Sequence, residues 1–227
     1  MLNRRKIINY IVQTAIFGGL ATILYVVPGL QFNLPVAPAF MSVHLDEIPV
    51  LISGFAYGPL LAIFELILKT LIKLPFTTSF GVGELGDLMY SLALILPATI
   101  IYKYHRNIKG AVVGLSIGLI LNLLFTSVVN LYTIFQLYIQ IYFGGKPGIV
   151  ASAFDAIFHW GITSDQDIRI AVLLLPFNLI KNTIVIGSTF IIYKPLRYVI
   201  EKANSSIKKR NKENNTVEEQ EKETTQD

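Results

Sequence analysis

The sequence predicts an all-α integral membrane protein with six transmembrane helices and with both termini in the cytoplasm. Three observations support this prediction. Of the 227 residues, 53% are hydrophobic and only 15% are charged, whereas soluble domains carry about 25% charged residues. The apolar residues are gathered in stretches that approach the roughly 20 helical residues needed to cross a bilayer. Finally, the basic residues cluster in connections that six crossings place on one side of the membrane.

The first three spans are predicted in the N-terminal third of the chain. The first covers residues 7–27 and is expected to be an uncleaved helix, because no small-residue cleavage site follows it. Gly58-Pro59 divides the next apolar stretch, since proline removes a helical hydrogen bond and disfavours helix at the residue before it. We therefore expect a short second span over residues 48–57, possible also as a re-entrant segment, and a third over residues 60–74.

Three further spans are predicted over residues 85–102, 111–131 and 171–193. The connection between the last two, residues 132–170, is too long and too polar in its second half to be buried entirely. Its stretch Phe154–Trp160 is expected to form an amphipathic surface helix.

Basic residues orient these spans. Three clusters fall on the predicted cytoplasmic side: Arg4, Arg5 and Lys6; Lys103, Arg106 and Lys109; Lys194 and Arg197. The opposite connections hold only Lys73, Lys146 and Arg169. Residues 1–200 are thus predicted to form the membrane domain. Residues 201–227 are charged and almost free of apolar side chains, so a disordered cytoplasmic tail is expected.

Several chemistries are excluded by the residues available. The chain has no cysteine, which excludes disulfides, thiolate metal sites and cysteine nucleophiles. Residues 81–86 match G-x-G-x-x-G but lack the strand and βαβ unit of a dinucleotide site, and residues 143–148 lack the spacing of a phosphate-binding loop. The three histidines lie in separate connections. We therefore predict no cofactor, no metal site and no ATPase activity on this chain.

Charged residues within the predicted spans are candidates for function, because charge in a bilayer is costly. Glu65 and Lys69 are spaced i, i+4, which allows an ion pair within one helix. Lys181 has no such neighbour and shares a helix face with Asn178. Two interpretations stay open for Lys181: a buried salt bridge to an acid such as Glu84 or Asp87, or a polar ligand pocket near the outer leaflet.

Small and polar residues form regular rows on two spans. Asn122, Thr126 and Asn130 make a polar stripe, and glycines at 110, 114 and 118 make a small-residue row typical of close helix packing. On the first span, Ala15 and Gly19 lie one turn apart, with Gly18 and Thr22 expected to widen the same strip. Such a strip offers a flat surface for a partner helix.

Five segments together resemble a known family: residues 44–59 with His-Leu-Asp-Glu-Ile-Pro, the Gly-Glu84-Leu start of the fourth span, Leu96-Pro97-Ala98, Tyr102-Lys103, and Pro176-Phe-Asn-Leu-Ile-Lys181. In order and spacing they are similar to the substrate-binding S components of energy-coupling factor (ECF) vitamin importers, in particular the riboflavin-binding branch. The resemblance implies a six-helix subunit that binds riboflavin from outside. It also implies a transmembrane coupling subunit and two cytoplasmic ATPase subunits as partners.

The resemblance also implies which residues act. Asn130, Asn178 and Lys181 correspond to ligand-binding positions, and Glu84 and Phe40 are added as candidates for ligand contact. The loop over residues 34–45 is expected to fold over the ligand as a lid. Ala15 and Gly19 correspond, with glycine in place of the second alanine, to a motif that contacts the coupling subunit.

Two alternatives remain at this point. The same fold can take another vitamin, such as pantothenate or a pyridoxine-like compound. An intramembrane enzyme is the other class, with Glu65, Glu84, His44 and His159 as its only plausible chemistry.

Overall fold

The computed structural model describes residues 4–35, 37–38 and 41–192, and residues 1–189 form one compact unit, to which the following description applies. The labelled helices are α1 (Arg4–Val26), α2 (Glu47–Tyr57), α3 (Pro59–Lys73), α4 (Val82–Tyr104), α5 (Ile108–Val129), α6 (Phe135–Leu137) and α7 (Ile149–Phe158). A last helix, without a label, covers Ile168–Ile192. Short 3-10 turns are η1 (Pro28–Leu30) and η2 (Leu74–Phe76), and π-helical segments are η3 (Asn130–Ile134) and η4 (Tyr138–Tyr142). The strands β1 (Phe32–Asn33) and β2 (Ser42–Val43) pair antiparallel.

The all-α membrane architecture is confirmed. Four helices in the described part of the chain are long and apolar enough to cross a bilayer: Ile7–Val26, Val82–Tyr104, Ile108–Tyr142 and Ile168–Ile192. The predicted break at Gly58-Pro59 is present, because α2 ends at Tyr57 and α3 begins at Pro59, with Gly58 at a φ of 110°. The count of six crossings and the cytoplasmic termini stay predictions. The tail 201–227, the domain boundary near residue 200 and Phe40 lie outside the described residues.

The fifth predicted span is longer than expected. Instead of ending at residue 131, the helix continues through η3, α6 and η4 to Tyr142. It then leads to α7, whose inner face packs Val150, Ala151 and Phe154 against Phe135 and Ile139 of the extension. The expected amphipathic helix is therefore present as α7, although it begins five residues before Phe154. Periodicity alone missed the extension because its aromatic and polar residues resemble a membrane-interface loop.

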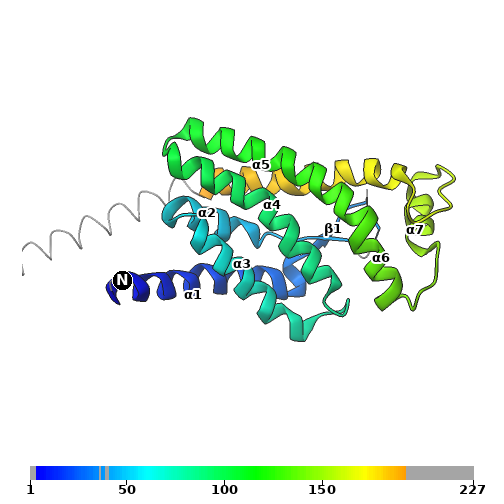
Figure 1. The fold of residues 1–227 in the computed structure, drawn as a ribbon, viewed down its shortest axis with the longest axis horizontal. Helices are drawn as coiled ribbons and strands as arrows, with labels where there is room; N and C mark the ends of the chain where they lie inside the picture. Colours follow the sequence, from blue (N-terminus) through cyan, green and yellow to red (C-terminus); the bar gives the residue numbers. More distant parts are fainter. Residues whose placement is uncertain (1–3, 36, 39–40, 193–227) are drawn as a thin grey trace, which may run out of the picture. The chain divides into compact units, whose positions relative to one another are not determined.

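Close packing of α4 and α5 explains the glycine row. The two helices lie side by side (Figure 1). A Cβ atom on Gly114 would lie 2.7 Å from the carbonyl oxygen of Ala98, and one on Gly118 would lie 2.4 Å from that of Leu94. Only glycine leaves room for these backbones to approach so closely. The packing role predicted for this row is confirmed.

The small residues of α1 divide between two faces. Gly18 is buried, and a Cβ there would meet Leu68 of α3 at 3.0 Å. Thr22 is also buried and donates a 2.7 Å hydrogen bond to the Gly18 carbonyl. The prediction that Gly18 and Thr22 widen the outer strip is therefore wrong, since both serve packing inside the bundle. Ala15 is exposed, and a Cβ on Gly19 would have no atom within 4 Å.

Candidate ligand-binding site

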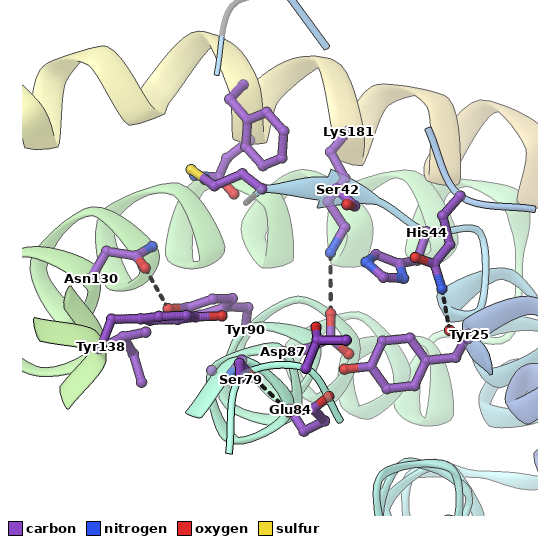
Figure 2. Close-up of a pocket in the computed structure, with 18 of the residues that line it drawn as sticks. Tyr25, Ser42, His44, Ser79, Glu84, Asp87, Tyr90, Asn130, Tyr138 and Lys181 are labelled. Carbon is purple, nitrogen blue, oxygen red and sulfur yellow. Dashed lines mark hydrogen bonds and ion pairs between the residues drawn. The ribbon is translucent and has the colours of Figure 1, made fainter. Parts of the chain in front are cut away.

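A cavity of about 190 Å³ lies between the β1–β2 loop, the start of α4, the η3 segment and the last helix. It has two chemically different ends. Figure 2 shows Asn130, Tyr90 and Tyr138 at one end and Tyr25 and His44 at the other, with Lys181 facing Asp87 between them. The side chains that line it are Tyr25, Gln31, Met41, Ser42, His44, Lys73, Thr78, Ser79, Glu84, Asp87, Tyr90, Asn130, Ile134, Phe135, Tyr138, Phe177, Asn178 and Lys181.

Part of the predicted lid, residues 34–45, forms one wall of this cavity. Met41, Ser42 and His44 contribute to its wall. Val43 is fully buried and packs with Ala37 against Phe177 of the last helix. Apolar contacts thus join Ala37 and Val43 to the last helix; whether this segment acts as a lid that moves with the ligand stays a prediction.

Lys181 combines the two interpretations that the sequence left open. Its Nζ lies 3.2 Å from Glu47 Oε1 and 3.5 Å from Asp87 Oδ1, and it also lines the cavity. Asp87 was one of the two predicted acids, whereas Glu84 does not pair with Lys181. A side chain with three donors can bridge two carboxylates and retain one donor for a ligand.

A second lysine joins the same group of charges beneath the cavity. Lys69 Nζ lies 2.8 Å from Asp87 Oδ2 and also contacts Asp46. We call Asp46, Glu47, Lys69, Asp87 and Lys181 the charge cluster; α2, α3, α4 and the last helix each contribute to it, together with the residue before α2. All five residues are at most 8% exposed. Because an unpaired buried charge is costly, these bridges hold the helices in one arrangement.

The predicted pair of Glu65 with Lys69 is not formed. Lys69 turns towards Asp46 and Asp87, while Glu65 Oε1 accepts a 2.5 Å hydrogen bond from Ser53. Spacing allows the pair, but Lys69 instead contacts two carboxylates from elsewhere in the fold, Asp46 before α2 and Asp87 on α4. Tertiary contacts therefore override the local pattern.

Tyr25 connects α1 to the polar end of the cavity. Its ring lies 4.8 Å from Lys69 Nζ, 5.2 Å from Lys73 Nζ and 4.9 Å from the His44 ring. Its carbonyl oxygen accepts hydrogen bonds from Lys73 and Gln31 at 3.3 and 2.7 Å. Burial lowers the pKa of His44 in the loop, which favours a neutral imidazole against the Tyr25 ring.

Glu84 lies at the bottom of the cavity, in the first turn of α4. Its Oε2 accepts hydrogen bonds from Thr77 and Ser79 at 2.8 and 2.9 Å. The helix N-terminus also favours a negative charge at this position. Glu84 thus presents a stabilised acceptor to the cavity, which suits contact with hydroxyl groups.

Two asparagines leave one polar atom each for a ligand. Asn178 Nδ2 donates to the Leu174 carbonyl at 3.0 Å, so its Oδ1 remains as an acceptor. Asn130 Oδ1 accepts from Tyr90 at 2.6 Å, so its Nδ2 remains as a donor. Neither remaining atom has a hydrogen-bond partner among the described residues. Both asparagines are less than 7% exposed and line the cavity.

The π-helical segment η3 begins at Asn130 and adjusts which side chains face the cavity. Asn130, Ile134 and Tyr138 all line it, at intervals of four residues along a segment wider than an α-helix. Such segments occur often at functional sites. Sequence reasoning identified Asn130 but missed Tyr138, because no residue pattern marks a π-helix.

Other cavity residues were also missed. Tyr25 and Tyr90 are single aromatic residues in apolar spans, and aromatic side chains there carry no signal of their own. Asp46 and Glu47 belong to the charge cluster and not to the cavity wall; they did carry a signal, because two adjacent acids at the start of an apolar stretch need partners.

Comparison with known proteins gives a family and two relatives. The family model described as "ECF transporter, substrate-specific component" matches residues 9–193. The riboflavin transporter RibU of Staphylococcus aureus (strain TCH60) is 27% identical over 173 residues, which cover 76% of this chain and 83% of that protein. The riboflavin transporter FmnP of Bacillus subtilis (strain 168) is 26% identical over 184 residues, covering 78% and 88%. The family prediction from the sequence is confirmed.

One solved structure has the same fold. It is described as the S component of a bacterial ECF transporter and aligns with a TM-score of 0.63, covering 85% of this chain and 97% of that one. At 20% identity, the similarity shows the fold alone. Both relatives are transporters, which argues against the intramembrane enzyme considered above.

Proposed function

Because this chain belongs to the family of substrate-specific components of ECF transporters, we propose that it binds riboflavin from outside the bacterial cell membrane and delivers it inward. The observation that carries this proposal is the two-ended cavity, which offers amide and ammonium groups beside aromatic walls and separate acceptors at its other end. The names of the two relatives support the choice of ligand.

The polar edge of the flavin ring matches the atoms that remain available. This edge has an N–H flanked by two carbonyl groups, so it needs one acceptor and two donors. Asn178 Oδ1 is the acceptor, and Asn130 Nδ2 and Lys181 Nζ are the donors. These are the three positions that the family resemblance indicated.

The remaining surfaces suit the other parts of the ligand. Tyr90, Tyr138, Phe135 and Phe177 supply aromatic walls for a flat ring system. The polyol chain of riboflavin carries several hydroxyl groups, for which Glu84 and the polar residues around it supply acceptors and donors.

The cavity volume supports the proposal that the loop moves. At about 190 Å³, it is smaller than the roughly 300–1,000 Å³ of most ligand sites. Riboflavin, with a three-ring system and a five-carbon chain, therefore enters only if the β1–β2 loop shifts outward. In this proposal, the contacts of Ala37 and Val43 with Phe177 are the ones that open.

Transport also requires a partner that supplies energy. We propose that Ala15 and Gly19 on α1 form the surface on which the transmembrane coupling subunit docks, with two cytoplasmic ATPase subunits bound to it. The support is exposure: Ala15 faces outward, and nothing lies within 4 Å of a Cβ built on Gly19. Small residues let another helix approach closely in lipid.

A titration of detergent-solubilised protein with riboflavin, followed by quenching of flavin fluorescence, tests the proposal. Lys181→Ala should weaken binding about tenfold or more, because a buried polar partner is lost; since it also removes a cation from the charge cluster, its unfolding temperature is measured alongside. Asn178→Ala should act in the same direction. Wild-type affinity in both variants would show that the site is elsewhere. Pantothenate and pyridoxine are titrated in parallel by calorimetry. Preferential binding of either would show that it, and not riboflavin, is the ligand.

A further inference from the structure

Tyr90 is held at both ends, by Asn130 of η3 and by Asn122 of α5. Its hydroxyl donates to Asn130 Oδ1 at 2.6 Å. Its main-chain carbonyl accepts from Asn122 Nδ2 at 2.8 Å. Asn122 is in turn fixed by Asn182 of the last helix, whose Nδ2 donates to Asn122 Oδ1 at 2.7 Å. Three helices therefore meet in one neutral network that ends at the cavity.

This network decides which way the Asn130 carboxamide faces. A carboxamide can turn over and exchange its oxygen and nitrogen, which are nearly equal in shape. The Tyr90 hydroxyl has no other acceptor among the described residues for its proton. Turning Asn130 over would let its Nδ2 donate to the Tyr90 hydroxyl oxygen, but it would leave the hydroxyl proton without an acceptor among the described residues. An unpaired buried polar group is costly, so Oδ1 stays on Tyr90.

We infer that Tyr90 is a positioning residue that holds Asn130 with its Nδ2 donor towards the ligand, and that it thereby makes this end of the cavity selective for a carbonyl oxygen. The inference rests on the proposed riboflavin function. It adds a residue that makes no hydrogen bond to the ligand itself but determines the polarity of the contact. Figure 2 shows Tyr90 beside Asn130, with the dashed line joining them.

The cavity selects between ligands by whether they present an acceptor or a donor to Asn130. With Asn130 fixed as a donor, a ligand that offers a carbonyl at this point gains a hydrogen bond. A ligand that offers an amino group at the same point brings two donors together and leaves both unpaired. Sites that depend on such buried polar matching discriminate strongly. If Tyr90 loses its hydroxyl, Asn130 becomes free to turn over and accept instead.

A double-mutant cycle in binding tests this role. Riboflavin affinity is measured by fluorescence quenching for the wild type, Tyr90→Phe, Asn130→Ala and the double variant. Tyr90→Phe alone should weaken binding about tenfold. In the Asn130→Ala background, the same change should alter affinity by less than about twofold, since there is no carboxamide left to orient. If the affinity losses of the two single variants multiply in the double variant, the residues act independently and the inference is overturned. Wild-type affinity in Tyr90→Phe would also overturn it.

Tyr138→Phe is the matched control, since Tyr138 is another cavity tyrosine and its hydroxyl has Ser79 as a hydrogen-bond partner. When Tyr138→Phe is combined with Asn130→Ala, the two losses of riboflavin affinity should multiply. When Tyr90→Phe is combined with Asn130→Ala, they should not. A cycle that is equally coupled for both tyrosines would point to general disturbance of the cavity and would overturn the positioning role.

The wild-type titration separates the two proposals. If wild type binds riboflavin but the Tyr90 cycle is additive, only the positioning role fails. If wild type does not bind riboflavin, the proposed function fails and the inference about Tyr90 fails with it. Thermal unfolding is recorded for every variant, because a purely structural role lowers the melting temperature without producing the coupling.

Discussion

Two groups of buried polar residues lie around the same cavity and differ in how they use their hydrogen-bonding atoms. The charge cluster joins lysines 69 and 181 to three acids, through ion pairs that cross between helices. The neutral network joins Tyr90 to Asn122, Asn130 and Asn182 through hydrogen bonds. Charges buried in a membrane protein must be paired, so the cluster fixes helix positions. Amides can bind one neighbour and keep one atom free, so the neutral network keeps a group for the ligand.

Removing a charge from the cluster should have the largest effect. Lys69→Met leaves Asp46 and Asp87 without their shared cation. Breaking a buried pair in this way costs about 3–5 kcal/mol, so we expect little folded protein by size-exclusion chromatography in detergent. A second change, Asp46→Leu, should partly restore the yield by removing one orphaned acid. If Lys69→Met alone remains as stable as wild type, the cluster does not hold the helices together.

Separating α4 from α5 should have the next largest effect. Gly118→Ala places a Cβ 2.4 Å from the Leu94 carbonyl, so α5 must move away. Overpacking of this kind costs about 1–3 kcal/mol, measured as a lower unfolding temperature. Gly187→Ala is the matched control, because no atom lies within 4 Å of a Cβ there. Equal stability of the two variants would contradict the close packing.

Two asparagines one turn apart on the last helix should separate ligand contact from structure. Asn178→Ala removes a free acceptor, so riboflavin affinity should fall about tenfold with little change in unfolding temperature. Asn182→Ala instead leaves Asn122 Oδ1 without its donor. It should lower stability by about 1–3 kcal/mol and change affinity less. Calorimetric titration and thermal unfolding of both variants separate the two roles. A stability loss in Asn178→Ala with an affinity loss in Asn182→Ala would contradict the assignment.

The smallest effect on the isolated subunit is expected for the double change Ala15→Trp and Gly19→Trp. Riboflavin affinity should match wild type, because neither position lines the cavity. Uptake should be lost in cells that contain the coupling subunit and the ATPases, because two indole rings prevent a helix from lying against α1. Loss of binding together with uptake would show instead that these residues pack inside the bundle.

The sequence by itself determined the membrane class, the helix break at Gly58-Pro59 and the family. These follow from apolar length, from the backbone chemistry of proline and from ordered motifs, all of which are local along the chain. It also indicated Asn130, Asn178, Lys181 and Glu84, which all line the cavity.

Only the tertiary structure decided which partner each polar group takes. Glu65 and Lys69 have the spacing of a pair, yet Lys69 pairs with Asp46 and Asp87 because helix packing brings those acids closer. Gly18 and Ala15 both belong to one row of small residues in the sequence, but the contact of α1 with α3 buries the first and leaves the second exposed. The orientation of Asn130 depends on Tyr90, which is 40 residues away in the chain. The physical reason is the same in each case: a buried polar or small group is satisfied by whatever lies beside it in space, and spacing along one helix does not specify that neighbour.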